Sequence, residues 1–202
     1  MELTDSQRRI AACLDSTLLV LAAVGSGKTT TLSERVAMAV ARGVEPARIL
    51  ALTFTNRAAS RMRESLAERD AIAARRVHVH TFHGLCMWIL RTEARSLGIS
   101  PSLWVHDEED SEALIKALGV NRPRNAMFRL HAEMSAEPLG EASLHRYATA
   151  AFSAEPWAAR YLNTLADRGA VDFAGLVYLA RAALSETPEV SRKWAERFDW
   201  IQ

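Results

Sequence analysis

A short glycine-containing loop separates an apolar run from a helical pattern near the start of the chain. The loop reads Gly25-Ser26-Gly27-Lys28-Thr29, and the aliphatic run before it is Leu18–Ala22. A triphosphate needs several backbone N–H groups turned toward it, which favours residues without a Cβ, and a cation for its charge. This order of apolar run, glycine loop, lysine, hydroxyl residue and helix is typical of a phosphate-binding loop. The alternative is an ordinary glycine turn with an exposed Lys28.

Each residue type in such a loop has an expected role. Lys28 would reach the β- and γ-phosphates, and the Thr29 hydroxyl would be a ligand of Mg²⁺, so these two are the candidate catalytic residues. The usual pattern begins with glycine, whereas Ala22 stands at that place here. The expected phosphate-end contacts are Ala22, Gly25, Ser26, Gly27, Lys28, Thr29 and Thr30.

The elements that must position this loop can be predicted from hydrophobic patterns. Apolar runs at 18–22, 49–54 and 77–81 predict three strands, and a helical pattern follows each of them. This alternation predicts an α/β fold whose parallel sheet is flanked by helices, with ligands gathered at the carboxyl ends of the strands. A short helix over 3–15, with Thr4 or Asp5 as its N-cap, is expected ahead of the first strand.

Beyond residue 105 the pattern changes to helices. Residues 106–169 show only helical signals and predict an all-helical insertion. The expected helices are 107–118, 124–136, 139–152 and 156–168, followed by helices over 171–184 and 188–198. Residues 199–202 are expected to begin a strand. Trp157, Tyr161 and Leu165 recur at helical spacing and are expected to be core.

Two strand ends combine an aromatic ring with polar residues. The segments are Thr53-Phe54-Thr55-Asn56-Arg57 and Thr81-Phe82-His83. Single-stranded nucleic acid needs an aromatic face for its bases and hydroxyl, amide or cationic groups for its phosphates. These segments are therefore candidate contacts for single-stranded nucleic acid, and the alternative is that Phe54 and Phe82 are core residues.

Three other groups of residues resemble reactive sites but are expected to have structural roles. The spacing His78-x-His80-x-x-His83 resembles a metal site, but no carboxylate or cysteine follows at ligand spacing, so solvent-facing or hydrogen-bonded histidines are expected. The acidic run Asp107–Asp110 could be mistaken for the Mg²⁺-organising acidic box of nucleotide hydrolysis, but it is expected to open a helix, where the macrodipole favours acids. Cys13 and Cys86 are far apart and are expected to be reduced.

Composition excludes several classes of protein. The chain has 202 residues, 49% of them hydrophobic and 24% charged, with a net charge of +1, as is ordinary for a globular protein. Basic residues outnumber acidic ones in the first hundred residues and the reverse holds afterwards, which hints at a polyanionic partner for the first half. No apolar run reaches membrane-spanning length, and the polar start has no signal-peptide core, so a cytoplasmic protein without membrane contact is expected.

The quoted motifs resemble those of the UvrD, Rep and PcrA family of superfamily 1 DNA helicases over essentially the whole chain. LTDSQRRIAA is similar to the family's Q motif, which implies that Gln7 reads adenine; from position alone a solvated helix-surface glutamine is the favoured interpretation. AAVGSGKTTTLSERVA is similar to motif I, although Ala23 and Val24 stand where glycine and alanine are usual. Arg35 matches an arginine that the family keeps near the adenine.

The resemblance continues along the chain. ILALTFTNRAASRMRESL is similar to motif Ia and VHTFHGLCMWILR to the TFH motif, which implies contacts with single-stranded DNA. The implied DNA-contacting residues are Phe54, Thr55, Asn56, Arg57, Thr81, Phe82 and His83. VDFAGLVYLARAAL resembles the family's VDFDDLL segment with Ala174-Gly175 in place of the acidic pair, and RFDWIQ resembles the lead into motif II.

The resemblance implies a P-loop, RecA-like fold and an ATP-dependent activity. Residues 1–105 and 170–202 would form an incomplete first motor domain, and 106–169 its helical insertion. We expect the amino-terminal part of a 3′-to-5′ DNA helicase that takes ATP and Mg²⁺, binds single-stranded DNA or its junction with duplex, and works with further helicase domains after Gln202. Because motif II is absent, we expect these residues to bind nucleotide without turnover. The alternatives are an inactive nucleotide- or DNA-binding module and, with less support, a small P-loop kinase.

Overall fold

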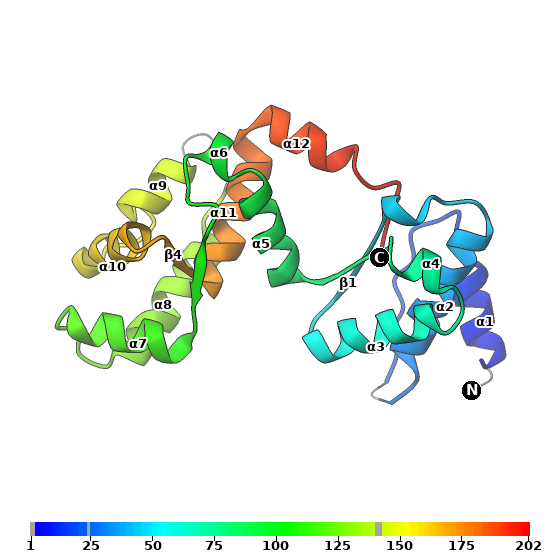
Figure 1. Cartoon of the computed structure of the whole chain (residues 1–202). Helices are drawn as coiled ribbons and strands as arrows, with labels where there is room; N and C mark the ends of the chain where they lie inside the picture. The colour runs from blue at the N-terminus through cyan, green and yellow to red at the C-terminus, as the bar shows by residue number, and fades with distance from the viewer. Residues whose placement is uncertain (1–2, 24, 140–142) are drawn as a thin grey trace. The chain divides into compact units, whose positions relative to one another are not determined.

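The computed structural model describes residues 3–23, 25–139 and 143–202. The chain forms two compact units, one of Met1–Phe82 with Ala195–Gln202 and one of His83–Trp194. Each unit is described by itself, with the labels of Figure 1. The predicted helical insertion, residues 106–169, lies inside the second unit. Its separation from a motor domain at those boundaries stays a prediction.

The first unit is a small parallel sheet with helices packed beside it. Its elements are α1 (Asp5–Ala12), α2 (Lys28–Ala41), the 3₁₀ helix η1 (Pro46–Arg48), β1 (Ile49–Thr53), α3 (Asn56–Ala67), α4 (Ala71–Ala74), β2 (His78–Thr81) and β5 (Trp200–Ile201). The strand order is β2-β1-β5, and both pairings are parallel. Helix α2 packs against α1 and α3, as Figure 1 shows. The mixed α/β class with a parallel sheet, expected from the alternating patterns, is confirmed.

Buried apolar side chains from the sheet and two helices form the core of this unit. Val36 of α2, Ile49 of β1, Met62 of α3 and Val79 of β2 belong to one cluster of buried side chains. Strand β1 lies in the middle of the sheet, so its residues Ile49–Ala51 are buried on both faces, as a continuous apolar run predicts.

Strand β5 adds the last residues of the chain to this sheet. The backbone N–H of Gln202 donates to the carbonyl of Leu50 at 2.9 Å, and the N–H of Leu52 donates to the carbonyl of Gln202 at 2.7 Å. The Arg48 guanidinium is hydrogen-bonded to Asp199 and lowers the pKa of that carboxyl. The expected strand start after residue 198 is confirmed.

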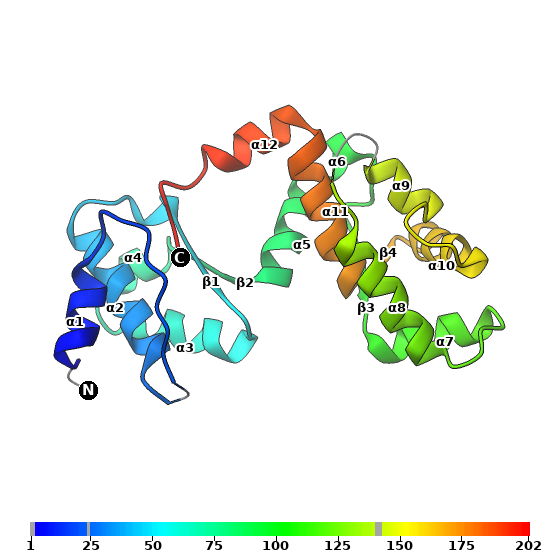
Figure 2. The ribbon, with the colours of Figure 1, turned by 180° about the vertical axis from the view of Figure 1, so that it is seen from behind.

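The prediction of a strand over residues 18–22 is wrong. Figure 2 draws this segment as irregular coil between α1 and α2, without a strand arrow. Leu19 and Leu21 are 88% and 89% exposed, and Leu18–Leu21 form no hydrogen bond with any described residue. A strand exists only where it can pair with the edge of a neighbouring strand. The apolar run has the composition of a strand but no such neighbour in the described part of the chain.

Side-chain caps begin two helices of the first unit. The Thr4 hydroxyl accepts from the N–H of Gln7, and the Gln7 side chain accepts from the N–H of Thr4, which makes a reciprocal capping box at α1. At α3 the hydroxyl of Thr55 accepts from the N–H of Ala58 at 3.1 Å. Thr55 is extended and caps this helix, and Asn56 is its first helical residue.

The second unit is mainly helical. Its elements are α5 (Phe82–Thr92), α6 (Ala94–Leu97), β3 (Trp104–His106), α7 (Glu108–Ala117), α8 (Pro123–Ala136), α9 (Ser143–Thr149), α10 (Pro156–Asp167), β4 (Ala170–Asp172), α11 (Phe173–Glu186) and α12 (Pro188–Ala195). The helical signals between residues 106 and 169 are confirmed. Residues 140–142 of the helix expected over 139–152 lie outside the described residues. Tyr161 and Leu165 are buried, as their spacing predicts, whereas Trp157 is half-buried and packs against the same core.

A short parallel strand was missed in this unit. Residues Ala170–Asp172 form β4 and pair with β3, with Val105 opposite Val171. The sequence pattern places the start of a helix at Val171, but three residues are too few for a recognisable strand period. The helical pattern that follows residues 77–81 is divided into α5 and α6, and α6 ends at Gly98 in the left-handed conformation.

Asp172 connects three segments inside the second unit. Its carboxylate, 1% exposed, accepts from the Tyr161 hydroxyl at 2.8 Å and from the N–H of Gly175 at 2.7 Å, and contacts Nε2 of His131 at 3.0 Å. A Cβ on Gly175 would lie 2.3 Å from the Tyr147 hydroxyl oxygen. This contact is the physical reason why an acidic residue does not fit at position 175.

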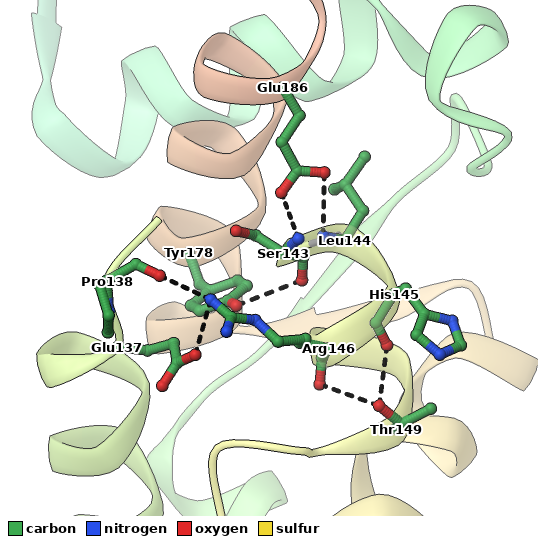
Figure 3. Close-up of polar contacts among 9 residues, drawn as sticks. All are labelled: Glu137, Pro138, Ser143, Leu144, His145, Arg146, Thr149, Tyr178 and Glu186. Atoms are coloured by element: carbon green, nitrogen blue, oxygen red, sulfur yellow. Dashed lines mark hydrogen bonds and ion pairs between the residues drawn. The ribbon is translucent and has the colours of Figure 1, made fainter. Parts of the chain in front are cut away.

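Polar contacts hold the start of α9 in place (Figure 3). The Glu186 carboxylate accepts from the backbone N–H groups of Ser143 and Leu144, so a side chain of α11 caps α9. Arg146 donates to Glu137 at 2.8 Å and to the Pro138 carbonyl at 2.7 Å. Helix α9 is therefore held by one ion pair, a hydrogen bond to a backbone carbonyl and a side-chain cap.

None of the helices in the described ranges is long and apolar enough to span a membrane.

Candidate functional site

Two glycines give the loop before α2 its shape. Gly25 and Gly27 have φ values of 80° and 78°, a region that residues with a Cβ rarely adopt. A Cβ on Gly27 would also lie 2.8 Å from the Gln7 side-chain nitrogen, so the second glycine lets α1 approach the loop closely. Val24, which differs from the family's usual residue, lies outside the described residues.

Gln7 is anchored to this loop by its amide group. Its Nε2 donates to the Ser26 carbonyl at 2.9 Å, and its Oε1 accepts from the N–H of Thr4 at 2.8 Å. An amide has two N–H donors and two oxygen lone pairs, so one donor and one acceptor remain for a ligand. Such a donor–acceptor pair matches the N7 and N6 positions of adenine. The geometry disfavours the alternative of a glutamine that only faces solvent.

Lys28 and Thr29 begin α2 at the end of the loop. The Lys28 ammonium donates to the carbonyls of Ala22 and Ala23 at 3.1 and 2.7 Å. The Thr29 hydroxyl has no partner among the described residues. The first backbone N–H groups of a helix have no intrahelical partner and carry positive partial charge. The cation, the hydroxyl and these N–H groups together suit a polyphosphate.

Arg35 lies about two turns after Lys28 on α2 and packs against Trp200, near the last residue of the chain. Its guanidinium carbon is 5.3 Å from the centre of the Trp200 ring, and its Nη2 donates to the Ser16 carbonyl at 3.5 Å. Its Nε is buried and has no hydrogen-bond partner among the described residues. Sequence reasoning missed Trp200 as a site residue, because only the pairing of β5 with β1 brings it to α2.

One cavity of about 960 Å³ connects these groups. It is near the upper end of the 300–1,000 Å³ that small-molecule pockets span. The predicted nucleotide-binding residues that line it are Gln7, Ala22, Ser26, Lys28 and Arg35. The remaining predicted residues, Gly25, Gly27, Thr29 and Thr30, are not among its lining residues. The structure thus brings the expected base end and part of the expected phosphate end to one cavity.

The strand-end residues of the first unit are at the surface. Phe54, directly after β1, is 88% exposed, and Phe82, directly after β2, is 55% exposed. Thr55, Asn56 and Arg57 are exposed, and Thr81 is half-buried. The alternative that the two phenylalanines are core residues is therefore wrong. Parallel pairing of Thr53 with Thr81 brings the two strand ends to the same edge of the sheet.

His83 belongs to the second unit, where it meets an aromatic ring that sequence reasoning missed. Its ring centre lies 5.2 Å from that of Phe173, at an interplanar angle of 81°. Phe173 is 44% exposed and lines a cavity of about 290 Å³ together with His83, Ser135 and Arg181. The sequence feature that could have identified Phe173 is the VDF segment, in which the aromatic residue follows the end of a strand, as Phe54 and Phe82 do.

The groups weighed as metal sites have other roles in the structure. The rings of His78 and His80 are stacked with centres 6.2 Å apart, and burial lowers the pKa of both. Asp107 caps α7 and accepts from the N–H of Asp110 at 2.9 Å, so the acidic run opens a helix as predicted. In the described ranges no group of three or more histidine, cysteine, aspartate or glutamate residues is arranged to hold a metal ion.

Comparison with known proteins places the chain in a family. Residues 3–202 match the UvrD/REP helicase N-terminal domain family. DNA helicase II of Escherichia coli is 32% identical over 97% of the chain and 28% of its own length. ATP-dependent DNA helicase UvrD1 of Mycobacterium tuberculosis is 29% identical over 97% of the chain and 27% of its own length. The chain therefore spans little more than a quarter of these curated relatives, and it belongs to the UvrD/REP helicase N-terminal domain family.

Proposed function

We propose that the chain is the ATP-binding and single-stranded-DNA-contacting amino-terminal part of an ATP-dependent DNA helicase. The observation that carries the nucleotide half is the cavity lined by Gln7, Lys28 and Arg35, which joins a donor–acceptor pair suited to adenine with a cation suited to phosphate. Arg35 would lie at the base end, where its buried Nε, which has no hydrogen-bond partner in the described part of the chain, has a donor to offer.

The residues of the loop suit Mg·ATP. The left-handed Gly25 and Gly27 leave the loop backbone open to phosphate oxygens. The Thr29 hydroxyl, without a partner among the residues that the structure describes, is at the helix start, where it could be a ligand of a phosphate-bound Mg²⁺. Mg²⁺ would neutralise charge on the phosphate oxygens. Lys28 would exchange its bonds to the Ala22 and Ala23 carbonyls for the β- and γ-phosphates. Its charge would then stabilise the negative charge that develops during phosphoryl transfer.

Hydrolysis needs further groups besides those of the loop. It requires acidic residues that organise Mg²⁺ and water, and arginines that stabilise the transition state. We propose that these come from the rest of the intact helicase and that residues 1–202 alone bind nucleotide without turning it over. Robust DNA-stimulated ATP hydrolysis by the 202-residue chain would contradict this division of roles. The proposed 3′-to-5′ direction of the whole protein can be measured with duplexes that carry a 3′ or a 5′ single-stranded tail.

The DNA half of the proposal rests on the exposed aromatics at the strand ends. Phe54 presents nearly its whole ring to solvent, and hydroxyl, amide and guanidinium groups follow at Thr55, Asn56 and Arg57. An exposed ring is a stacking face for a base, and the polar groups beside it can bind the sugar–phosphate backbone. Thr81, Phe82 and His83 would provide a second set of the same kind.

Replacing Phe54 with alanine tests this surface. A stacked base contributes about 1–3 kcal/mol, so we expect binding of a fluorescein-labelled oligothymidylate to weaken by about tenfold in fluorescence anisotropy. The matched control is Ile72→Ala, because Ile72 is also a large exposed apolar residue of the first unit but lies on α4. Equal affinities of the parent chain and the Phe54 variant would remove Phe54 from the proposed surface.

A further inference from the structure

The exposed face of α3 carries two arginines one helical turn apart. Arg57 and Arg61 are both exposed, and neither forms a hydrogen bond or ion pair with any described residue. Residues four apart lie on the same face of a helix. Arg57 is three residues after the exposed Phe54, so this pair of cations continues from the aromatic strand end along the helix.

Other arginines on and near this helix do have partners. Arg63 donates to the Val79 carbonyl, and Arg69 pairs with Glu34. Like charges four residues apart repel and destabilise a helix, and the positive end of the helix dipole lies at the same end of α3. An anion bound across Arg57 and Arg61 would relieve both effects.

The chemistry of the surroundings favours a nucleic-acid strand as that anion. An exposed aromatic ring beside two guanidinium groups offers a stacking face for a base and charge-assisted hydrogen bonds for phosphates. The carboxylates of Glu64, further along α3, and of Glu68, at its C-cap, limit the cationic surface to the first two turns. A surface of this length suits neighbouring phosphates of one strand.

We propose that Arg61, with Arg57, binds the phosphate backbone of a single DNA strand whose base contacts Phe54. This inference rests on the proposed DNA-binding function and extends it to a residue outside the strand-end segment. Arg61 supplies charge and position without sequence preference, because phosphate contacts fix register and carry no base information.

The test is a salt titration of the Arg61→Ala variant with labelled oligothymidylate. Loss of one phosphate contact lowers the slope of log affinity against log salt concentration by about 0.7, which corresponds to about fivefold weaker binding at 0.1 M salt. Alanine is the best helix former, so α3 is expected to remain intact, as circular dichroism can verify. Arg61→Lys keeps the charge and is expected to retain the parent slope.

Arg75→Ala is the matched control. Arg75 is exposed and without a partner among the described residues, but it precedes β2 and is therefore at the opposite end of that strand from Thr81. An equal slope loss in the Arg75 variant would overturn the inference. So would an unchanged slope in the Arg61 variant while Phe54→Ala weakens binding, or competition by polyglutamate as strong as that by oligothymidylate. If neither the Phe54 nor the Arg61 variant changes binding, the proposed DNA surface fails together with the inference.

Discussion

Alanine in place of Lys28 is expected to weaken binding of a fluorescent ATP analogue with Mg²⁺ by about 10- to 100-fold. A hydrogen bond to a charged group contributes about 1.5–3 kcal/mol, and the ammonium is the cation of the loop that lines the cavity. The bonds that Lys28 makes to the Ala22 and Ala23 carbonyls are exposed, so their loss leaves no buried group unpaired. The large effect should therefore be on binding rather than on folding.

Fluorescence anisotropy measures the affinity directly, and thermal unfolding gives a second readout. A ligand at one hundred times its Kd stabilises the folded state by about 2.7 kcal/mol, and this stabilisation should be lost in the variant. Lys116→Ala is the matched control, because Lys116 is an exposed lysine on α7 in the other unit. If the Lys28 variant bound nucleotide as tightly as the Lys116 variant, the loop would not be the phosphate cradle.

Asp172→Ala is expected to reduce the free energy of unfolding of the second unit by about 3–5 kcal/mol. It removes a buried carboxylate that accepts from Tyr161 and Gly175 and contacts His131, and it leaves these groups without their partner. The corresponding fall in the thermal midpoint is on the order of 10 °C. Asp172→Asn keeps an acceptor for the N–H of Gly175 and should cost less.

Asp167→Ala is the control for this change. Asp167 is exposed at the end of α10 and has no partner among the described residues, so its loss is expected to change stability by less than about 0.5 kcal/mol. Chemical denaturation followed by circular dichroism compares the variants. Equal stabilities of the Asp172 and Asp167 variants would contradict the role given to the buried network.

The same network makes stability depend on pH. Burial alone raises the pKa of Asp172, but the hydrogen bond and charge of His131 and the bonds from Gly175 and Tyr161 together lower it below its ordinary value. A carboxyl whose pKa is lower in the folded state stabilises that state fully above its unfolded pKa of about 3.9. This contribution is lost as pH falls through the folded-state value. The stability difference between the parent chain and Asp172→Asn should therefore shrink below about pH 4.

The sequence predicted most helices of this protein, because helix signals are local. The hydroxyls of Thr4 and Thr55 and the left-handed Gly98 act within a few residues of the helix ends that they define. Strands were predicted less well. The apolar run at 18–22 is not paired and β4 was missed, because a strand depends on an edge supplied by a distant segment, and β4 pairs with residues more than sixty positions earlier.

The sequence alone also determined the parts of the site that lie next to one another in the chain. The order of Gly25, Gly27, Lys28 and Thr29 before a helix is a local pattern, and the conformation of the two glycines follows from it. The exposure of Phe54 was left open by the sequence, since a ring at a strand end can face either the core or solvent.

Only the tertiary structure brought separate segments together. The contact of Gln7 with Ser26, the packing of Arg35 on Trp200 and the burial of Asp172 against His131 each join residues at least nineteen positions apart. Such contacts depend on how helices and strands pack, because side-chain hydrogen bonds and ring contacts act over only a few ångströms. A one-dimensional pattern therefore identified the loop, and the three-dimensional packing decided which residues surround it.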